Sequence, residues 1–392
     1  MNVNKLVHPL KIRDVQIRCV QIRAVQLMAV LVATLLLSSP ASAIRASGYL
    51  KSYAIARDRP EVPQIDTDEL YQSQNTVRLM WDYLGDGTSF QFHYELGAVL
   101  SSKEPFLPQP ASTSDHRWRL VDIDSTPNDN PRAQLFQNLD RFNLQFNFES
   151  GDLTIGRQAI TFGMARIINP TDVFLPFDVR TLNTEYRLGV DAIRFQRPLG
   201  QLGELDLGII PGKDAGPDTS AAFFRLRNNS SGVDYQLTLA RFVGESLAGV
   251  GIETSLGNFG FWLEVASVFG REDFTRVSTG IDYAFSENVF GMVEYHYNGA
   301  GADDPRNYIE NTANLAYQSG AVFLLGSHYL IPAVNVQLTP LWSIGIQSIF
   351  NLGDQSAFVS VSAENNIATN FYLDVGYYHF IGDRISAPPL TL

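Results

Sequence analysis

Hydrophobic and polar residues alternate over many short segments of this chain. Within residues 141–148, Phe142, Leu144, Phe146 and Phe148 alternate with polar side chains. A strand with this pattern has an apolar environment on one face and water on the other. The alternation recurs along the chain, and no segment longer than a turn or two has helical spacing. The pattern predicts about seventeen strands of roughly ten residues, the length that a tilted strand needs to cross a bilayer.

Connections of two kinds separate these strands. Residues 149–152 form a tight turn, a second strand runs over residues 153–161, and a long non-periodic segment, 162–187, leads to a third strand at 190–196. Short turns that alternate with long loops are typical of a transmembrane β-barrel. We therefore predict an all-β fold, a transmembrane antiparallel β-barrel of about 16–18 strands, with long outer loops and residues 162–187 folded into the lumen.

An odd number of strands conflicts with closure, because single-chain bacterial barrels have an even number. Two segments are candidates for a hidden strand, residues 116–123 and 313–318. Alternatively, the chain lacks its closing strand. The last clear strand is 370–380, and the tail, 381–392, contains two adjacent prolines, which pair poorly in a sheet.

The N-terminal region predicts export. A basic region precedes an apolar run at residues 24–37, and Ala41-Ser42-Ala43 is a suitable cleavage site. The alternative, a membrane anchor, is disfavoured because the apolar run is shorter than the ~20 residues of a spanning helix. We expect a signal peptide at 1–43 and an outer-membrane barrel at 44–392. Cys19, the only cysteine, lies in the signal peptide, so the mature chain has no disulfide.

The net charge of the mature chain limits the classes of partner that we expect. The mature chain keeps 24 basic and 40 acidic residues, a formal charge of −16. An acidic surface disfavours nucleic acid. It suits divalent cations at a cell surface, although solvated loops explain it equally well. The expected partners are outer-membrane lipid, the barrel assembly machinery and a small polar solute.

Two segments carry a resemblance to a known family. Residues 156–160 read GRQAI, and residues 189–194 read GVDAIR. In these segments the chain resembles Gram-negative outer-membrane porin-type barrels, and most closely the alginate-export-like barrels. The resemblance implies a barrel fold and, for the alginate-export-like group, polysaccharide export. Such barrels usually end on an aromatic residue, whereas this chain ends on Leu392.

Arginines concentrate in and after this region. If residues 162–187 fold into the lumen, wall arginines would face acids across a narrow passage, and the transverse field would select solutes. The alternative is an ion-paired network that only holds the loop to the wall. The candidate selectivity residues are Arg141, Arg157, Arg194, Arg225, Arg227, Asp172, Asp178, Glu185 and Asp191.

Arg157 has an awkward position in this scheme. It shares parity with the apolar Leu153 and Ile155, which predicts a lipid-facing arginine. A β-bulge near Gly156 would turn it inward. Otherwise a lipid-facing arginine would cost roughly 2–4 kcal/mol at mid-membrane.

Other candidate chemistry is weak. His93, His296 and His328 suggest a hydrolase, but no Gly-x-Ser-x-Gly motif accompanies them, and lumen lining explains His93 and His296 better. The acidic groups Asp66-x-Asp68-Glu69 and Asp122-x-Asp124 lack EF-hand spacing. We expect no metal, no cofactor and no enzyme activity.

The leading hypothesis is an outer-membrane channel for diffusion of small polar or anionic solutes, with selectivity set by the arginines and the 162–187 loop. Exopolysaccharide export is an alternative. Two further alternatives come from other classes: a lipid-active outer-membrane hydrolase and a non-conducting structural barrel. The sequence fixes neither the solute nor the oligomeric state.

Overall fold

The computed structural model describes residues 44–57, 70–103, 116–120, 130, 132–174, 176, 186–216 and 218–382. This part of the chain contains seventeen antiparallel strands, so the predicted all-β fold is confirmed. The predicted signal peptide lies outside it. The strands are β1 (Ile44–Arg57), β2 (Leu70–Gly85), β3 (Thr88–Ser101), β4 (Ala133–Phe148), β5 (Gly151–Gln158), β6 (Val190–Leu199), β7 (Gly203–Ile210), β8 (Ala221–Ser230), β9 (Val233–Phe242), β10 (Glu245–Leu256), β11 (Phe259–Phe269), β12 (Phe274–Ser286), β13 (Val289–Asn298), β14 (His328–Thr339), β15 (Trp342–Asn351), β16 (Ala357–Ala368) and β17 (Phe371–Ile381).

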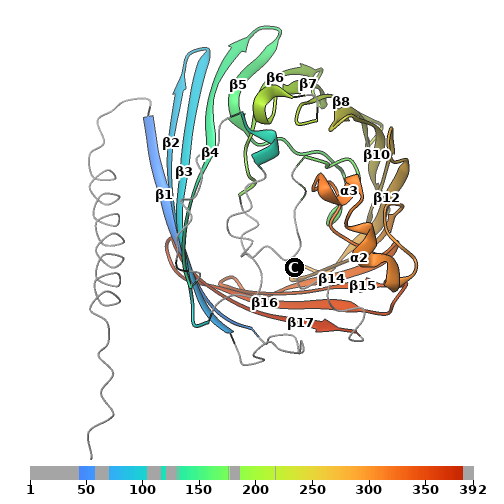
Figure 1. The fold of residues 1–392 in the computed structure, drawn as a ribbon. Coiled ribbons are helices and arrows are strands. Elements are labelled where there is room, and N and C mark those ends of the chain that lie inside the picture. Colours follow the sequence, from blue (N-terminus) through green and yellow to red (C-terminus); the bar gives the residue numbers. More distant parts are fainter. Residues whose placement is uncertain are drawn as a thin grey trace, which may run out of the picture.

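Each strand pairs with the next one in the chain, from β1–β2 to β16–β17. Figure 1 shows the strands following one another around a ring, with short helices on its inner side. Because the number of described strands is odd, β1 and β17 run in the same direction. The registers describe β1 against β2 and β17 against β16.

The two predicted hidden strands are wrong. Residues 116–118 form the 3₁₀ helix η2 (His116–Trp118), and residues 315–318 form the helix α3 (Leu315–Gln318). The remaining helices of the described residues are η3 (Lys213–Ala215), η4 (Pro305–Asn307) and α2 (Tyr308–Asn311). No helix in the described ranges has the length and apolar character to cross a membrane.

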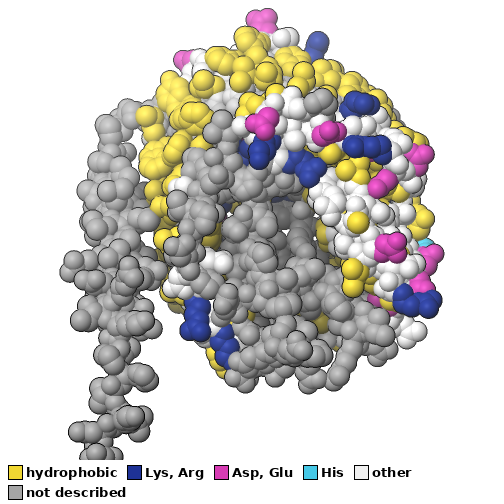
Figure 2. Space-filling view, viewed as in Figure 1, with side chains coloured by type: hydrophobic (Ala, Val, Ile, Leu, Met, Phe, Trp, Pro, Cys, Tyr) yellow, Lys and Arg dark blue, Asp and Glu magenta, His cyan; other side chains and the backbone are white. Residues whose placement is uncertain are grey.

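Alternate side chains of the strands face outward and are apolar. Phe142, Leu144, Val250 and Ile281 are all about half exposed, as expected of side chains that contact lipid. Figure 2 shows such hydrophobic side chains gathered over the outer edge of the barrel wall. The predicted alternation in 141–148 is therefore the two faces of β4.

One bulge in β4 sets which polar side chains face inward. His93 of β3 pairs with Arg141, but the next residue, Tyr94, pairs with Leu139, so Asp140 is the extra residue. Before the bulge Asn138 and Asp140 are buried, and after it Asn143 is. The bulge switches the inward positions from even to odd numbers, so that the consecutive residues Asp140 and Arg141 both face inward.

The two rims of the barrel differ. Eight hairpins, from β2–β3 to β16–β17, close through turns of two or three residues at one rim, which we call the short-turn rim. The long connections, including 159–189 and 299–327, leave from the opposite, long-loop rim. In outer-membrane barrels the short turns are periplasmic and the long loops extracellular.

A charged residue on the lipid-facing surface should destabilise the barrel according to its depth. Val250 lies in the middle of β10 and Leu256 at its short-turn end, both outward and more than half exposed. We expect Val250→Arg to lower the free energy of unfolding in liposomes by roughly 2–4 kcal/mol, and Leu256→Arg by about 0–1 kcal/mol. Urea titration of the refolded protein measures both, and equal losses would contradict the assignment of this face to lipid.

Candidate functional site

The connection between β5 and β6 begins with a segment inside the barrel, residues 159–174, which we call the lumen loop. It is anchored on Glu264 of β11, whose side chain is fully buried. Glu264 accepts hydrogen bonds from the backbone N–H groups of Met164 (2.6 Å), Ala165 (3.1 Å) and Thr171 (2.8 Å). The Thr171 hydroxyl donates a fourth bond at 2.6 Å. Four donors satisfy a carboxylate that would otherwise be costly to bury.

A second carboxylate from the wall holds the middle of the lumen loop. Glu294 of β13, also fully buried, accepts from the backbone N–H groups of Arg166 (2.9 Å), Ile167 (3.2 Å) and Ile168 (2.9 Å). The indole of Trp262 donates to it at 3.0 Å. The lumen loop is therefore curled around two negative charges that belong to the wall.

These two glutamates were missed at the level of sequence. Both follow the inward parity of their strands, as many other polar side chains do. On β11 the other inward residues are apolar, Trp262, Ala266 and Val268. An acid on an otherwise apolar inner face was the available signal. Sequence spacing alone does not reveal which loop it meets.

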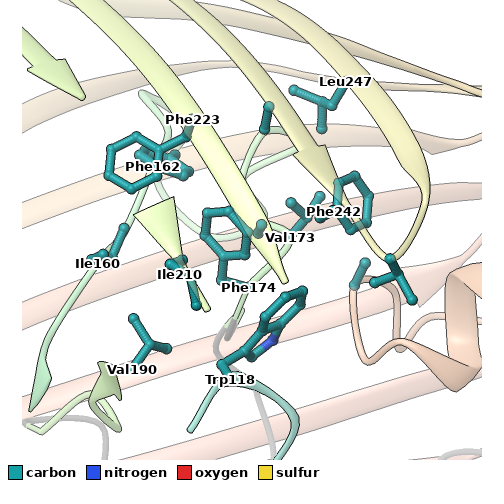
Figure 3. Packing of buried hydrophobic residues seen from close by; sticks show 14 of the residues in the cluster. Trp118, Ile160, Phe162, Val173, Phe174, Val190, Ile210, Phe223, Phe242 and Leu247 are labelled. Carbon is teal, nitrogen blue, oxygen red and sulfur yellow. The ribbon is translucent and has the colours of Figure 1, made fainter. Parts of the chain in front are cut away.

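Apolar packing covers the rest of the lumen loop. Phe162 lies 5.5 Å from Phe174 and 5.0 Å from Phe223 of β8 between ring centroids. Trp118 of η2 packs edge-on to Phe174 at 5.2 Å. Figure 3 shows these rings gathered between the lumen loop and the wall. Aromatic burial of this size contributes several kcal/mol, so the lumen loop is a packed element of the barrel interior.

The end of the β5–β6 connection contacts a distant part of the wall. The Tyr186 hydroxyl lies 2.7 Å from Nδ1 of His93, and the Arg78 guanidinium stacks 3.9 Å from the Tyr186 ring centroid. Arg141 donates to the Arg187 carbonyl at 3.0 Å. Arg187 in turn forms an ion pair with Asp172 in the lumen loop. The connection thus links β11 and β13 with β2, β3 and β4.

Most of the other predicted arginines pair with acids of adjacent strands. Arg194 of β6 binds Asp206 of β7 through two 2.8 Å bonds, and Arg225 of β8 contacts the same carboxylate at 2.8 Å. Arg225 also pairs with Glu204 at 2.6 Å. Arg227 stands opposite Glu204 in the register and is exposed. These contacts form a charge-alternating row along the inner face of β6, β7 and β8.

Arg157 fits neither of the two alternatives that the sequence left open. The β4–β5 register is continuous from Phe148–Gly151 to Phe142–Arg157, so no bulge near Gly156 turns the side chain inward, and because it is buried it does not face lipid either. β5 ends one residue later, and the buried Arg157 side chain spans the end of the strand. It binds Asp191 of β6 at 2.7 Å and the Leu139 carbonyl of β4 at 3.0 Å. The GRQ and DAIR segments therefore contact each other and close the wall.

A second long connection also enters the barrel. It comprises residues 299–327, between β13 and β14, and its side chains Tyr308, Ala316, Ala321 and Leu324 are buried. This connection meets the lumen loop through Arg276 of β12, which donates to the carbonyl oxygens of Pro170 (3.4 Å) and Ala321 (3.1 Å).

The three candidate histidines each contact a polar side chain. His93 contacts Asp82 at 2.9 Å, and His296 is buried against the Ser278 hydroxyl at 2.8 Å. That hydroxyl also donates to the Ile168 carbonyl at 2.5 Å, so it is enclosed by the lumen loop. His328 contacts Tyr295.

Among the described residues no group of three or more histidine, cysteine or acidic side chains is placed to hold a metal. The positions Asp66, Asp68, Glu69, Asp122, Asp124, Asp178 and Glu185 lie outside the described residues.

Replacing the anchoring carboxylates should release the lumen loop. In Glu264→Gln and Glu294→Gln an amide NH₂ would meet backbone donors, and we expect exchange of the amides in residues 164–171 to accelerate at least about tenfold, for a loss of 1.4 kcal/mol or more. Hydrogen–deuterium exchange measures this. The matched control is Glu253→Gln, which removes only a contact with the Arg166 side chain. Unchanged exchange in both anchor variants would contradict the anchoring role.

The stability of the lumen loop should depend on pH through Asp172. Burial raises the pKa of Asp172 to about 6, although the Arg187 and Arg276 guanidinium groups oppose the shift and Glu264 adds to it. Because the folded state favours the protonated acid, its stabilisation is complete below the ordinary value of 3.8 and is lost as pH rises through about 6. We expect the temperature midpoint of heat modifiability on gels to fall as the pH rises from about 4 to about 6, and to fall less in Asp172→Asn. Parallel curves for the two proteins would exclude this titration.

Comparison with known proteins gives the fold. No protein-family model matches the chain, and no curated protein sequence matches it. Many solved structures are similar, and three of them are compared below. Pseudomonas aeruginosa OccK5 (OpdH) has a TM-score of 0.53 and 10% identity, over 87% of this chain and 93% of that one. Acinetobacter baumannii OccAB4 has a TM-score of 0.52 and 9% identity, over 87% and 94%. Pseudomonas aeruginosa OpdQ has a TM-score of 0.52 and 10% identity, over 86% and 93%.

At sequence identities this low, the comparison supports a shared fold but no conclusion about substrate or function. The alignments extend over most of this chain and most of each neighbour. This chain has the fold of the outer-membrane porin barrels.

Proposed function

We propose that this protein is an outer-membrane channel for the diffusion of small polar solutes. The observation that carries the proposal is a loop packed and hydrogen-bonded inside a transmembrane barrel, on Glu264 and Glu294. Such a loop reduces the cross-section of the lumen and fixes polar groups there, which is how a barrel selects among solutes. The porin-type fold of the neighbours supports it.

The arginines take the role of a tether in this proposal. Arg157, Arg194 and Arg225 each contact carboxylates of neighbouring strands, so much of their charge is compensated locally. An anionic solute needs positive charge that is not compensated in this way. The pairing favours small polar solutes over anionic ones. Arg194 and Arg225 also donate to the carbonyls of Ala159 (3.4 Å) and Thr161 (3.3 Å) in the lumen loop, so selection then depends on the loop that they help to hold.

The proposal includes the route to the membrane. Residues 1–43 would act as the signal peptide, and the mature chain would insert into the outer membrane with the barrel assembly machinery. The lipid-facing side chains of β4 and β10 support contact with lipid.

The alternatives receive less support. The contact of Arg157 with Asp191 explains the GRQ and DAIR segments through wall construction, so they carry no argument for polysaccharide export. A hydrolase would need an accessible nucleophile, whereas Ser278 beside His296 is fully buried.

Planar-bilayer recording tests the proposal. We expect discrete conductance steps from the heat-modifiable folded protein. The double variant Glu264→Gln/Glu294→Gln should show larger or noisier steps, because a released loop obstructs the lumen less. The unfolded, heat-treated protein is the control and should be silent. Silence of the folded wild type would favour the structural-barrel alternative.

A further inference from the structure

The described residues cover the inner face of the barrel unevenly. In the middle of β9 to β13 and toward their long-loop ends the inward side chains are enclosed, and Thr238, Glu264 and Ser278 are each 0% exposed. On β14 to β17 the inward side chains nearer the short-turn rim are exposed instead. They include six polar residues, Asn335, Gln337, Ser343, Ser362, Glu364 and Asp374.

The registers establish that these six positions face the lumen. Phe358 of β16 pairs with Ile349 of β15, and both belong to the buried cluster that includes Ile168 of the lumen loop. Counting in steps of two along β16 from Phe358 leads to Ser362 and Glu364 on the same face. The partners of these residues on β14, β15 and β17 share that face.

Among the described residues of the two inserted connections, the apolar packing against this wall lies near the long-loop rim. The second cluster joins Ile168 and Leu324 to Tyr329, Ile331 and Phe358, at the long-loop ends of β14 and β16. Closer to the short-turn rim, most of the exposed inward side chains are amides, hydroxyls and carboxylates, together with the ring of Tyr372. A polar inner face that water reaches is what the wall of an aqueous passage requires.

Charge on this wall is negative. Glu364 of β16 and Asp374 of β17 are direct partners in the register, and both are exposed. Cross-strand partners on one face lie about 4.5–5.5 Å apart at Cβ, so two like charges repel there. Water and mobile cations relieve that repulsion, and the pair attracts cations in return. By contrast, Arg194 of β6 and Arg225 of β8, on the same inner face but on other strands, share the buried Asp206.

We infer that solutes pass along the inner face of β14–β17, and that Glu364 and Asp374 give this passage a preference for cations and ammonium-bearing solutes over anions. The inference rests on the proposed channel function and deepens it. It moves the charge selection from the arginines of β6–β8 to an acidic pair that the sequence analysis did not single out.

Thiol labelling tests the path. The only native cysteine lies in the predicted signal peptide, so a substituted cysteine in the mature chain is unique. In Ser362→Cys, a sulfonate-bearing methanethiosulfonate reagent should react and reduce single-channel conductance by about half. Thr238→Cys, on the enclosed wall, should neither react nor change conductance. Mass spectrometry counts the label in each variant. Labelling of Ser362→Cys without a fall in conductance, or no labelling at all, overturns the path.

Reversal potentials in a salt gradient test the charge. Wild type should favour potassium over chloride, and Glu364→Gln/Asp374→Asn should lower that permeability ratio by about twofold or more. Glu287→Gln, in the exposed β12–β13 turn, is the matched control and should leave the ratio unchanged. An anion preference in wild type, or an equal fall in the control, overturns the selectivity.

The two failures are distinguishable. A folded wild type without any conductance defeats the proposed function itself. A conducting wild type whose labelled Ser362→Cys variant is unaffected defeats only the passage along β14–β17.

Discussion

Two buried carboxylates are the constraint on which the interior of this barrel depends. Glu264 and Glu294 each accept four hydrogen bonds, six of the eight from backbone N–H groups of one loop. An irregular loop has backbone donors that must be satisfied, and a buried carboxylate has acceptors that must be satisfied. The N–H groups of the loop satisfy the carboxylate oxygens, and the carboxylates satisfy the N–H groups. A loop without these anchors would have to hydrate its amides inside the lumen, and its apolar side chains could not stay packed against the wall.

The apolar contacts follow from that arrangement. Once residues 164–171 are curled around the two glutamates, Phe162 and Phe174 lie on either side of the curled segment and reach Phe223 and Trp118. The same geometry puts Asp172 within reach of Arg187, so the far end of the connection returns to Arg141 and His93. One connection thereby ties opposite parts of the wall together. This explains why so many charged side chains face inward without an aqueous environment of their own.

The arginines show how the same residue type serves different purposes in one lumen. Arg157 closes the wall where β5 ends, and Arg194 and Arg225 share Asp206 across three strands. In both places a guanidinium with five donors satisfies carboxylate and carbonyl oxygens at a join between strands. Glu364 and Asp374 lack such a neighbour in the register, and they are exposed, whereas Asp206, which Arg194 and Arg225 share, is fully buried. Compensated charge holds the structure, whereas uncompensated charge is available to a solute.

The sequence by itself determined the wall. Alternation with period two, short turns and long loops are local properties, so they revealed the β-barrel, the lipid-facing set that includes Phe142 and Leu144, and the inserted connection after β5. Tertiary structure decided everything that depends on contacts between distant strands. Glu264 is about a hundred residues from the amides that it binds, and periodicity gives a face but no partner. The segments at 116–118 and 315–318 became helices because they pack inside the barrel, where no neighbouring strand offers a ladder. The Arg157 side chain does not contact lipid because β5 ends one residue later and the side chain spans that end of the strand. Only the registers of β4, β5 and β6 together show where β5 ends relative to its neighbours.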